Sequence, residues 1–420
     1  MYHKTTLDNG LRLTTATMPH TRSVCVSIFI GTGSRYEPDT EAGISHFIEH
    51  LLFKGTEKRP TTREISTAIE QVGGIINGGT DKEVTVYWAK VPKHHFATAL
   101  DILTDILLHP RFEAKAIEKE RQVIIEEINM TRDVPSQQAN MLIDELLWPD
   151  HPLGRDIAGT RESVTAISRD NLTDYLKRQY QPDNAVVAIA GNIQHREMIS
   201  AVSQMLGGWT SQQPRLGYTA YQPKPAQRLR IQKRKTEQAH LCLAVPGLPL
   251  PHPQRFTLDL LNVILGEGMS SRLFTEIRER LGLAYSIHSY VEHFLDSGSL
   301  NVSAGVEPKK LETAIKAIRE QLSQLKELVP EAELFRAKEF SKGRLLLRME
   351  DSRNVAGWLG GQEILTERIL SPDQIISIID AITAEELKNL AQELIADTKL
   401  HLAVVGPISQ DEPLKKLLSM

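Results

Sequence analysis

One order of strands and helices occurs twice along this chain, and that repetition constrains its fold more than any other feature. An apolar strand candidate at residues 24–30 is followed by a turn and a helix, and residues 241–245 begin the same succession in the second half. Each half continues with a glycine-containing turn, a strand and amphipathic helices. Strands that alternate with helices, repeated after about 210 residues, predict an α+β protein with duplicated domains.

A stretch rich in Gly, Pro, Ser and Gln, which lies at residues 207–225, separates the two halves. Such composition without hydrophobic periodicity is typical of a linker. We therefore predict a first domain at residues 1–209, a linker at residues 210–227 and a second domain at residues 228–420.

Composition excludes several classes of protein. The 49 Lys and Arg residues against 53 Asp and Glu give a net charge of −4, too balanced for a protein that binds nucleic acid through bulk charge. Two cysteines rule out a disulfide scaffold. No apolar run reaches the roughly 18 residues that a membrane span needs, and the N-terminus lacks the apolar region of a signal peptide. We therefore expect a cytoplasmic protein without nucleic-acid or membrane partners.

The segment from Glu41 to Gly55 has the spacing of an amphipathic helix. Asp39 or Thr40 can cap its start, and Gly55 can end it. Apolar side chains share one broad face of this helix, namely Ile44, Phe47, Ile48, Leu51 and Leu52.

Two histidines and a glutamate share the opposite face of the same helix. His46 and His50, at positions i and i+4, can both present a ring nitrogen to one Zn²⁺ ion. Glu49 lies beside them and is placed to take a proton from a zinc-bound water. The pattern is His-x-x-Glu-His, the reverse of the commoner zinc-protease motif. A surface helix that carries two histidines by chance is the alternative.

A catalytic zinc site needs a third protein ligand, and a second acidic helix at residues 116–129 offers one. Glu120 and Glu127 lie seven residues apart, so they share a helix face, whereas Glu126 is rotated away from it. We predict Glu127 as the third ligand and Glu120 as a group that orients a ligand or the water. The alternative for these glutamates is a solvated helix face.

These residues resemble the pitrilysin/insulinase family of zinc metallopeptidases, which includes the mitochondrial processing peptidase beta subunit and its bacterial single-chain homologues. His46, Glu49, His50 and Glu127 match the family's spacing, and Glu120 matches its auxiliary glutamate. The flanking segments match too, and they read GISHFIEHLLFKGT, GGIINGGTDKEVTVYWAKV, ERQVIIEEI and HPLGRDIAGT. The resemblance covers nearly the whole chain. It implies two tandem homologous α/β-sandwich domains, each an antiparallel-rich sheet with helices packed on it.

The resemblance also implies substrate-binding residues in each half. In the family, the strand that follows the turn at residue 73 is an edge that pairs with extended substrate through backbone hydrogen bonds. The stretch beside the scissile bond would be Asn77, Gly78, Gly79 and Thr80, where the family usually has Asn-Ala. In the second half, Arg278 and Tyr285 match a pair, seven residues apart, that binds the substrate backbone and helps to stabilise the tetrahedral intermediate.

The function implied is that of a zinc metalloendopeptidase with one Zn²⁺ per chain, which cleaves peptides or unfolded segments inside a closed chamber. Because relatives of this length reach four domains by pairing, a homodimer is the expected assembly. One alternative is a non-catalytic structural subunit of the respiratory-complex core type, although such subunits have degraded zinc motifs. Another is one subunit of a hetero-oligomeric processing peptidase. The sequence does not name the physiological substrate.

Overall fold

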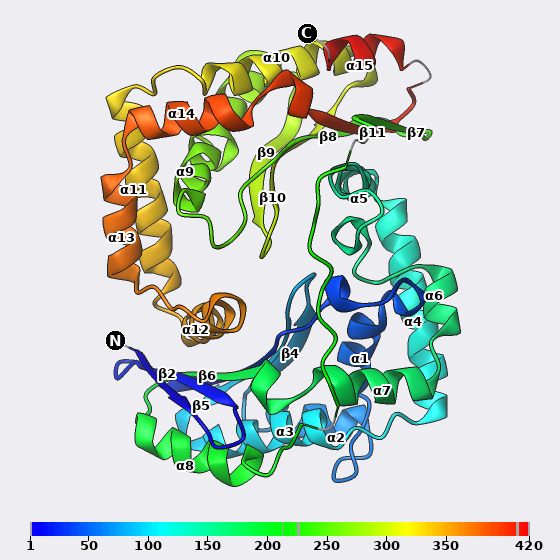
Figure 1. Ribbon diagram of the computed structural model, residues 1–420, viewed down its shortest axis with the longest axis vertical. Helices are drawn as coiled ribbons and strands as arrows, with labels where there is room; N and C mark the ends of the chain where they lie inside the picture. Colours follow the sequence, from blue (N-terminus) through cyan, green and yellow to red (C-terminus); the bar gives the residue numbers. More distant parts are fainter. Residues whose placement is uncertain (1, 212, 225–226, 409–410, 419–420) are drawn as a thin grey trace. The chain divides into compact units, whose positions relative to one another are not determined.

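A computed structural model describes residues 2–211, 213–224, 227–408 and 411–418 of the chain (Figure 1). Packing divides the chain into two compact units. The first contains Met1–Ile128, Asp156–Thr219 and Leu346–Ser371, and the second contains Asn129–Arg155, Ala220–Leu345 and Pro372–Met420. One of the five places where the chain passes between the units, residues 219–220, lies inside the predicted linker, of which residues 212, 225 and 226 lie outside the described residues. Each unit thus also includes one segment from the other half of the chain.

The first unit is built on a six-stranded sheet in the order β1-β2-β6-β3-β5-β4. Its strands are β1 (Tyr2–Thr6), β2 (Arg12–Thr17), β3 (Ser23–Ile30), β4 (Ile75–Thr80), β5 (Thr85–Pro92) and β6 (Ala185–Gly191). Neighbouring strands are antiparallel except for β2 and β6, which pair in parallel. Strand β4 is therefore an edge strand, with β5 as its neighbour in the sheet.

The second unit is built on a five-stranded sheet in the order β7-β11-β8-β10-β9. Its strands are β7 (Leu229–Lys233), β8 (Ala239–Pro246), β9 (Ala284–His293), β10 (Gly298–Val306) and β11 (His401–Gly406). The pair β7 and β11 is parallel and the others are antiparallel, which repeats the plan β2-β6-β3-β5-β4 of the first sheet. The predicted fold class, two related domains with antiparallel-rich sheets and packed helices, is confirmed. Strand β9 occupies the edge that β4 occupies in the first sheet.

Helices surround both sheets (Figure 1). From the first half come α1 (Ile44–Leu52), α2 (Thr62–Glu70), α3 (Phe96–Leu108), α4 (Ala114–Asp133), α5 (Pro135–Leu147), α6 (Arg161–Ala166), α7 (Arg169–Gln179) and α8 (His195–Leu206). From the second come α9 (Arg255–Gly266), α10 (Leu311–Gln324), α11 (Glu331–Arg348), α12 (Ser352–Thr366), α13 (Pro372–Ala381), α14 (Ala384–Leu394) and α15 (Glu412–Leu417). No helix of the described ranges is both long enough and apolar enough to cross a bilayer.

Both faces of the first sheet are buried. Along β3, the side chains of Val24, Val26 and Ile28 enter a core formed with α1, α3 and α4. The alternate side chains, including Cys25 and Phe29, enter a second core formed with α12. Since successive side chains of a strand point to opposite faces, a strand that is covered on both sides reads as a continuous apolar run. That is the character of VCVSIFI, the segment from which the sequence predicted this strand.

Helix α12, from the second half of the chain, covers the face of the first unit's sheet opposite to α1, α3 and α4. Its Glu363 side chain is fully buried there, where one carboxylate oxygen lies 2.6 Å from the Lys4 amine and 3.3 Å from the Arg12 guanidinium. A buried carboxylate is tolerated when it is paired with positive charge, and here Lys4 and Arg12 pair with the Oε1 atom of Glu363 at the helix–sheet boundary. In the second unit, α5 from the first half packs in the same way on β8 and β11, where its apolar residues meet Cys242, Ala244 and Ala403.

Glycine is required where α12 comes closest to the sheet. A Cβ atom placed on Gly360 would lie 2.2 Å from the Phe29 ring, whereas one on Gly361 would meet no atom of the described chain within 4 Å. We predict that Gly360→Ala lowers the free energy of unfolding by about 1–3 kcal/mol through overpacking. The matched change Gly361→Ala, in the same helix, should be neutral or stabilise by up to about 1 kcal/mol, since alanine favours helix. Denaturant unfolding of both variants measures the difference, and equal stabilities would contradict the packing described here.

Candidate metal centre

Helix α1 carries the predicted metal-binding motif and begins later than the sequence predicted. Asp39 lies in a separate 3₁₀ turn, and the residue that precedes the helix is Gly43, with a φ of 93°. The left-handed conformation is open to glycine, and a Cβ here would also lie 2.4 Å from the Ala158 carbonyl oxygen. The prediction that Asp39 or Thr40 caps α1 is therefore wrong. The helix ends at Leu52, with Gly55 beyond the following turn.

A buried glutamate replaces the missing cap. The two carboxylate oxygens of Glu37 accept hydrogen bonds from the backbone N–H groups of Gly43 and Ser45, each at 2.8 Å. These groups belong to the helix N-terminus, where donors lack partners within the helix and a negative charge is favoured. The Ser45 hydroxyl also lies 2.9 Å from the phenol of Tyr175 on α7. The start of α1 is thus held by residues outside it.

Two imidazole rings and one carboxylate meet on the polar face of α1. The Nε2 atoms of His46 and His50 lie 3.1 Å apart, and the Oε2 atom of Glu127 lies 3.8 Å from the first and 3.6 Å from the second. For a tetrahedral zinc ion with bonds near 2.1 Å, ligand atoms are about 3.4 Å apart. The three atoms form a triangle of that size, so the predicted ligands His46, His50 and Glu127 fit a Zn²⁺ ion.

The second predicted glutamate, Glu120, lies behind His50. Its Oε1 atom is 2.9 Å from His50 Nδ1, and its Oε2 atom is 2.8 Å from the Lys54 amine. Burial by itself raises the pKa of Glu120, but the hydrogen bonds from His50 and Lys54 outweigh it and hold this pKa below its usual value. An ionised carboxylate only accepts hydrogen bonds, so in the neutral His50 ring Nδ1 carries the proton and Nε2 keeps a lone pair for a metal.

Glu49 also lies near the histidines. Its carboxylate lies close enough to the two imidazoles to be considered as a metal ligand itself. However, its Oε2 atom is 4.0 Å from His50 Nε2, whereas the Oε2 atom of Glu127 is 3.6 Å from it. We therefore retain Glu127 as the ligand and Glu49 as the acid–base group. Glu49 is mostly buried, whereas the Glu127 side chain is 38% exposed.

Burial and neighbouring charge change the proton affinities at this centre. Burial lowers the pKa of His46 to about 4; His50 adds to this effect and Glu120 opposes it. Burial also acts to lower the pKa of His50, but the hydrogen bond to Glu120 and the charges of Glu49 and Glu127 raise it overall. Burial raises the pKa of Glu49, with His50 acting against the rise and Glu127 adding to it. A neutral His46 can donate a lone pair to a metal, and a carboxyl group with a raised pKa suits proton transfer near neutral pH.

The edge strand β4 passes directly beside Glu49. A Cβ on Gly78 would lie 2.5 Å from Glu49 Oε1, so glycine leaves the room that this carboxylate occupies. The neighbouring Asn77 accepts a hydrogen bond from the Gly78 amide with its own side-chain oxygen at 2.8 Å. The predicted stretch Asn77, Gly78, Gly79 and Thr80 is therefore placed next to the candidate centre by the sheet order and by packing of α1 against β4.

A buried arginine holds α4 in place against α1. The Arg121 guanidinium donates hydrogen bonds to the backbone carbonyls of Val164 and Ile167, which flank the end of α6, and its centre lies 5.4 Å from the ring of Phe47. A buried guanidinium whose donors are satisfied fixes the rotation of its helix, because moving it would leave those donors unpaired. Glu120 directly precedes Arg121 in α4, so the same contacts set where that carboxylate lies.

Arg278 and Tyr285 lie together in the second unit. Arg278 belongs to a π-helical turn, Phe274–Arg280, and Tyr285 to the edge strand β9. The Arg278 guanidinium lies 4.9 Å from the centre of the Tyr285 ring and 4.6 Å from that of Phe274. Both side chains line an open pocket of about 420 Å³. The spacing that the sequence showed thus brings the two side chains into contact.

Sequence reasoning missed three residues that shape the centre, namely Glu37, Lys54 and Arg121. Lys54 had a readable pattern, because it continues the four-residue spacing of His46 and His50. Glu37 and Arg121 had no such pattern. Each forms hydrogen bonds with a segment that comes close only when the chain is folded.

Comparison with known proteins gives consistent results for both halves of the chain. Residues 12–161 match the family model described as insulinase (peptidase family M16), and residues 166–340 match the model described as the peptidase M16 inactive domain. A protein of Bacillus subtilis called uncharacterized zinc protease YmxG is 36% identical over 97% of this chain and 98% of its own length. An uncharacterized zinc protease of Mycobacterium leprae is 38% identical over 99% of this chain and 94% of its own length.

Solved structures share the fold at low sequence identity. A protease from Helicobacter pylori superimposes with a TM-score of 0.91 at 22% identity, and covers 97% of this chain and 99% of its own. A chain of the complex III dimer from Candida albicans superimposes with a TM-score of 0.82 at 19% identity, over 99% of each chain. At these identities the likeness concerns the fold alone.

The assignment of Glu127 as a ligand can be tested against its neighbour. We predict that Glu127→Gln weakens zinc binding by more than about tenfold, since even groups behind the ligands contribute that much. The matched variant Glu126→Gln changes an exposed glutamate on the same helix and should retain normal affinity. Titration of each metal-free protein with zinc against a chelating dye measures the two affinities. Equal affinities in the two variants would remove Glu127 from the ligand set.

Proposed function

This chain belongs to the insulinase family, peptidase family M16, and on that premise we propose that it is a zinc-dependent endopeptidase. The observation that carries the proposal is the triangle of His46, His50 and Glu127 donor atoms, with the buried Glu49 carboxylate beside it. A structural zinc site is closed by four protein ligands, whereas three ligands leave a position for chemistry. The substrates would be peptides or unfolded segments that enter a closed chamber.

In the proposed mechanism each residue has one task. Zinc, when bound to His46, His50 and Glu127, supplies a Lewis acid that makes water a stronger nucleophile near neutral pH. Glu49 accepts the proton of the attacking water and returns it to the leaving amine. The edge of β4 at Asn77 to Thr80 orients an extended peptide by backbone hydrogen bonds, which give affinity without reading the side chains of the peptide.

Arg278 and Tyr285 complete the proposal. A guanidinium and a phenol are both hydrogen-bond donors, and such donors stabilise the negative charge that develops on a carbonyl oxygen during attack. Their mutual contact supports a shared role, because the guanidinium lies close to both the Tyr285 ring and the Phe274 ring. We assign both to the substrate backbone and the developing oxyanion.

One zinc ion per chain is consistent with the match of the second half to an inactive domain. In that half, β8 leads into α9 as β3 leads into α1, but the α9 sequence RFTLDLLNVILG contains no histidine. The His-x-x-Glu-His motif lies within residues 12–161, which match the insulinase model itself. The name of the second model therefore does not argue against activity of the first half.

Two alternatives concern assembly. The fold is shared with a chain of a respiratory complex, so a non-catalytic subunit is a second candidate, and one subunit of a hetero-oligomeric processing peptidase is a third. Cleavage of a peptide library by the purified chain, abolished by a chelator and restored by zinc, would exclude both. Light scattering on the same sample tests the proposed homodimer, and a monomeric active chain would contradict that part of the proposal.

A substitution of Glu49 can test catalysis separately from zinc binding. We predict that Glu49→Gln retains zinc but lowers kcat for peptide cleavage by about 10²–10⁴-fold, because an amide cannot accept the proton. Zinc content by mass spectrometry and initial rates on a quenched fluorescent peptide measure the two properties. Glu126→Gln serves as the control with normal rates. Cleavage that persists in Glu49→Gln would refute its role as the base.

The role of Arg278 can be compared with that of Arg280 in the same turn. We predict that Arg278→Gln lowers kcat by about a hundredfold or more, as expected for loss of an oxyanion donor. Arg280 is exposed and pairs with Glu276, so Arg280→Gln should leave the rate within about twofold, as is usual for an exposed ion pair. Steady-state kinetics on one peptide measure both variants. If the two behave alike, Arg278 has no special part in the reaction.

A further inference from the structure

We infer that Lys54 is a positioning residue for the proposed metal centre, which acts through Glu120 on the orientation of His50. The inference rests on the zinc site of the proposed function but not on peptide cleavage. It assigns a task to a residue that lies outside the His-x-x-Glu-His motif.

One carboxylate joins the two residues. Glu120 accepts a hydrogen bond from His50 Nδ1–H on Oε1 at 2.9 Å, and its Oε2 atom lies 2.8 Å from the Lys54 amine. The Glu120 side chain is 5% exposed and that of Lys54 is 30% exposed, so the contact is largely shielded from water. Both oxygens of Glu120 are therefore used, and rotating the carboxylate to suit one partner would break its bond to the other.

The backbone around Lys54 supports this geometry. His46, His50 and Lys54 follow one another at intervals of four residues. Helix α1 ends at Leu52, but the Lys54 amide still donates to the Leu51 carbonyl at 3.0 Å, so the chain keeps turning. Residues four apart on a helix lie on one face, which directs Lys54 and His50 toward the same side of α4.

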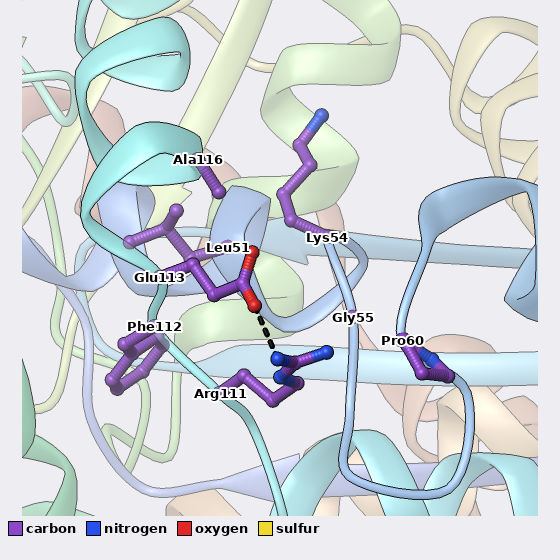
Figure 2. A pocket seen from close by; sticks show the side chains of 8 residues that line it. All are labelled: Leu51, Lys54, Gly55, Pro60, Arg111, Phe112, Glu113 and Ala116. Atoms are coloured by element: carbon purple, nitrogen blue, oxygen red, sulfur yellow. Dashed lines mark ion pairs between the residues drawn. The ribbon is translucent and has the colours of Figure 1, made fainter.

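Among the described residues, Glu120 is the carboxylate that forms an ion pair with Lys54, and the Lys54 charge also acts to lower the pKa of Glu49. Figure 2 shows the small pocket at the base of Lys54, where Glu113 faces Arg111 and forms an ion pair with it. The same pocket encloses only about 10 Å³, room for about one water molecule, so it is not a ligand site. In the described part of the chain, the ion pair of Lys54 is with Glu120.

The consequence concerns the metal rather than the fold. With Lys54 in place, Glu120 is held in the orientation that accepts a hydrogen bond from His50 Nδ1–H. The ring is then oriented so that its Nε2 atom can bind a metal. Without the amine, the second oxygen of a buried carboxylate lacks its charged partner, and the carboxylate gains freedom to leave His50. The alternative is an ion pair that stabilises only the local fold.

A double-mutant cycle distinguishes these readings. Zinc affinity would be measured by competition with a chelating dye, in metal-free Lys54→Met, Glu120→Gln and the double variant. We expect Lys54→Met to weaken binding by about tenfold, and to have no further effect once Glu120 is replaced. Lys54→Arg should restore most of the affinity, because it keeps the positive charge. The matched control is Lys58→Met, which removes an exposed lysine paired with Asp101 and should change nothing.

A second readout needs no metal. In the metal-free protein, at a pH where the His50 ring is neutral, ¹⁵N NMR should report one tautomer with the proton on Nδ1, and Lys54→Met should shift it toward a mixture. Unchanged zinc affinity and an unchanged tautomer in Lys54→Met, or additive losses in the double variant, would overturn the inference. If Glu127→Gln also binds zinc normally, the proposed metal centre itself is wrong, an outcome distinct from failure of the role of Lys54 alone.

Discussion

The carboxylate of Glu120 ties helix α4 to helix α1 behind the candidate metal centre, and the geometry of the centre depends on this contact. A buried carboxylate requires donors, and α1 with its following turn supplies them from His50 and Lys54. Once Glu120 is placed, Glu127 follows two helical turns later, about 10 Å along α4 and on the same face. The relation between two histidines on one helix and a glutamate on another thus follows from one buried hydrogen-bonded group.

The centre also depends on how α1 is held. Its N-terminus is satisfied by Glu37, and its apolar face packs on the first sheet. Arg121 adds a contact between α4 and the ring of Phe47. These contacts are independent of the metal ligands, so they fix the polar face of α1 before any ion binds. Such preorganisation is what a metal site needs if ligand geometry is to be held closely.

The sequence predicted what is local and periodic. The strand at residues 24–30, the helix at 116–129 and the shared face of His46, Glu49 and His50 all follow from repeating patterns, and the structure contains β3, α4 and α1 there. The pairing of Glu127 with the histidines was also predicted, because a zinc site needs a third ligand. The helix cap was missed because the capping carboxylate, Glu37, lies several residues before the helix. It reaches the start of α1 only because Gly43, in a left-handed conformation, turns the chain there.

The sequence also did not predict that α5 packs on the sheet of the second unit and α12 on the sheet of the first, each on the sheet of the other half of the chain. The residue pattern of an amphipathic helix does not specify which of two apolar sheet faces it covers, and each half of the chain has such a face. The pattern predicts that such helices are buried, and tertiary packing alone decides where.

The packing of α12 on the sheet of the first half has a consequence for folding during synthesis. The contact between Arg12 and Glu363 joins residues 351 positions apart. During synthesis, the first sheet therefore emerges from the ribosome long before the helix that covers one of its faces, and that apolar face stays open meanwhile. Contacts of such long sequence separation are closed slowly, and exposed apolar sheet surface favours aggregation. The first unit is complete only when most of the second has been translated, so the first cannot finish folding before synthesis of the second is well advanced.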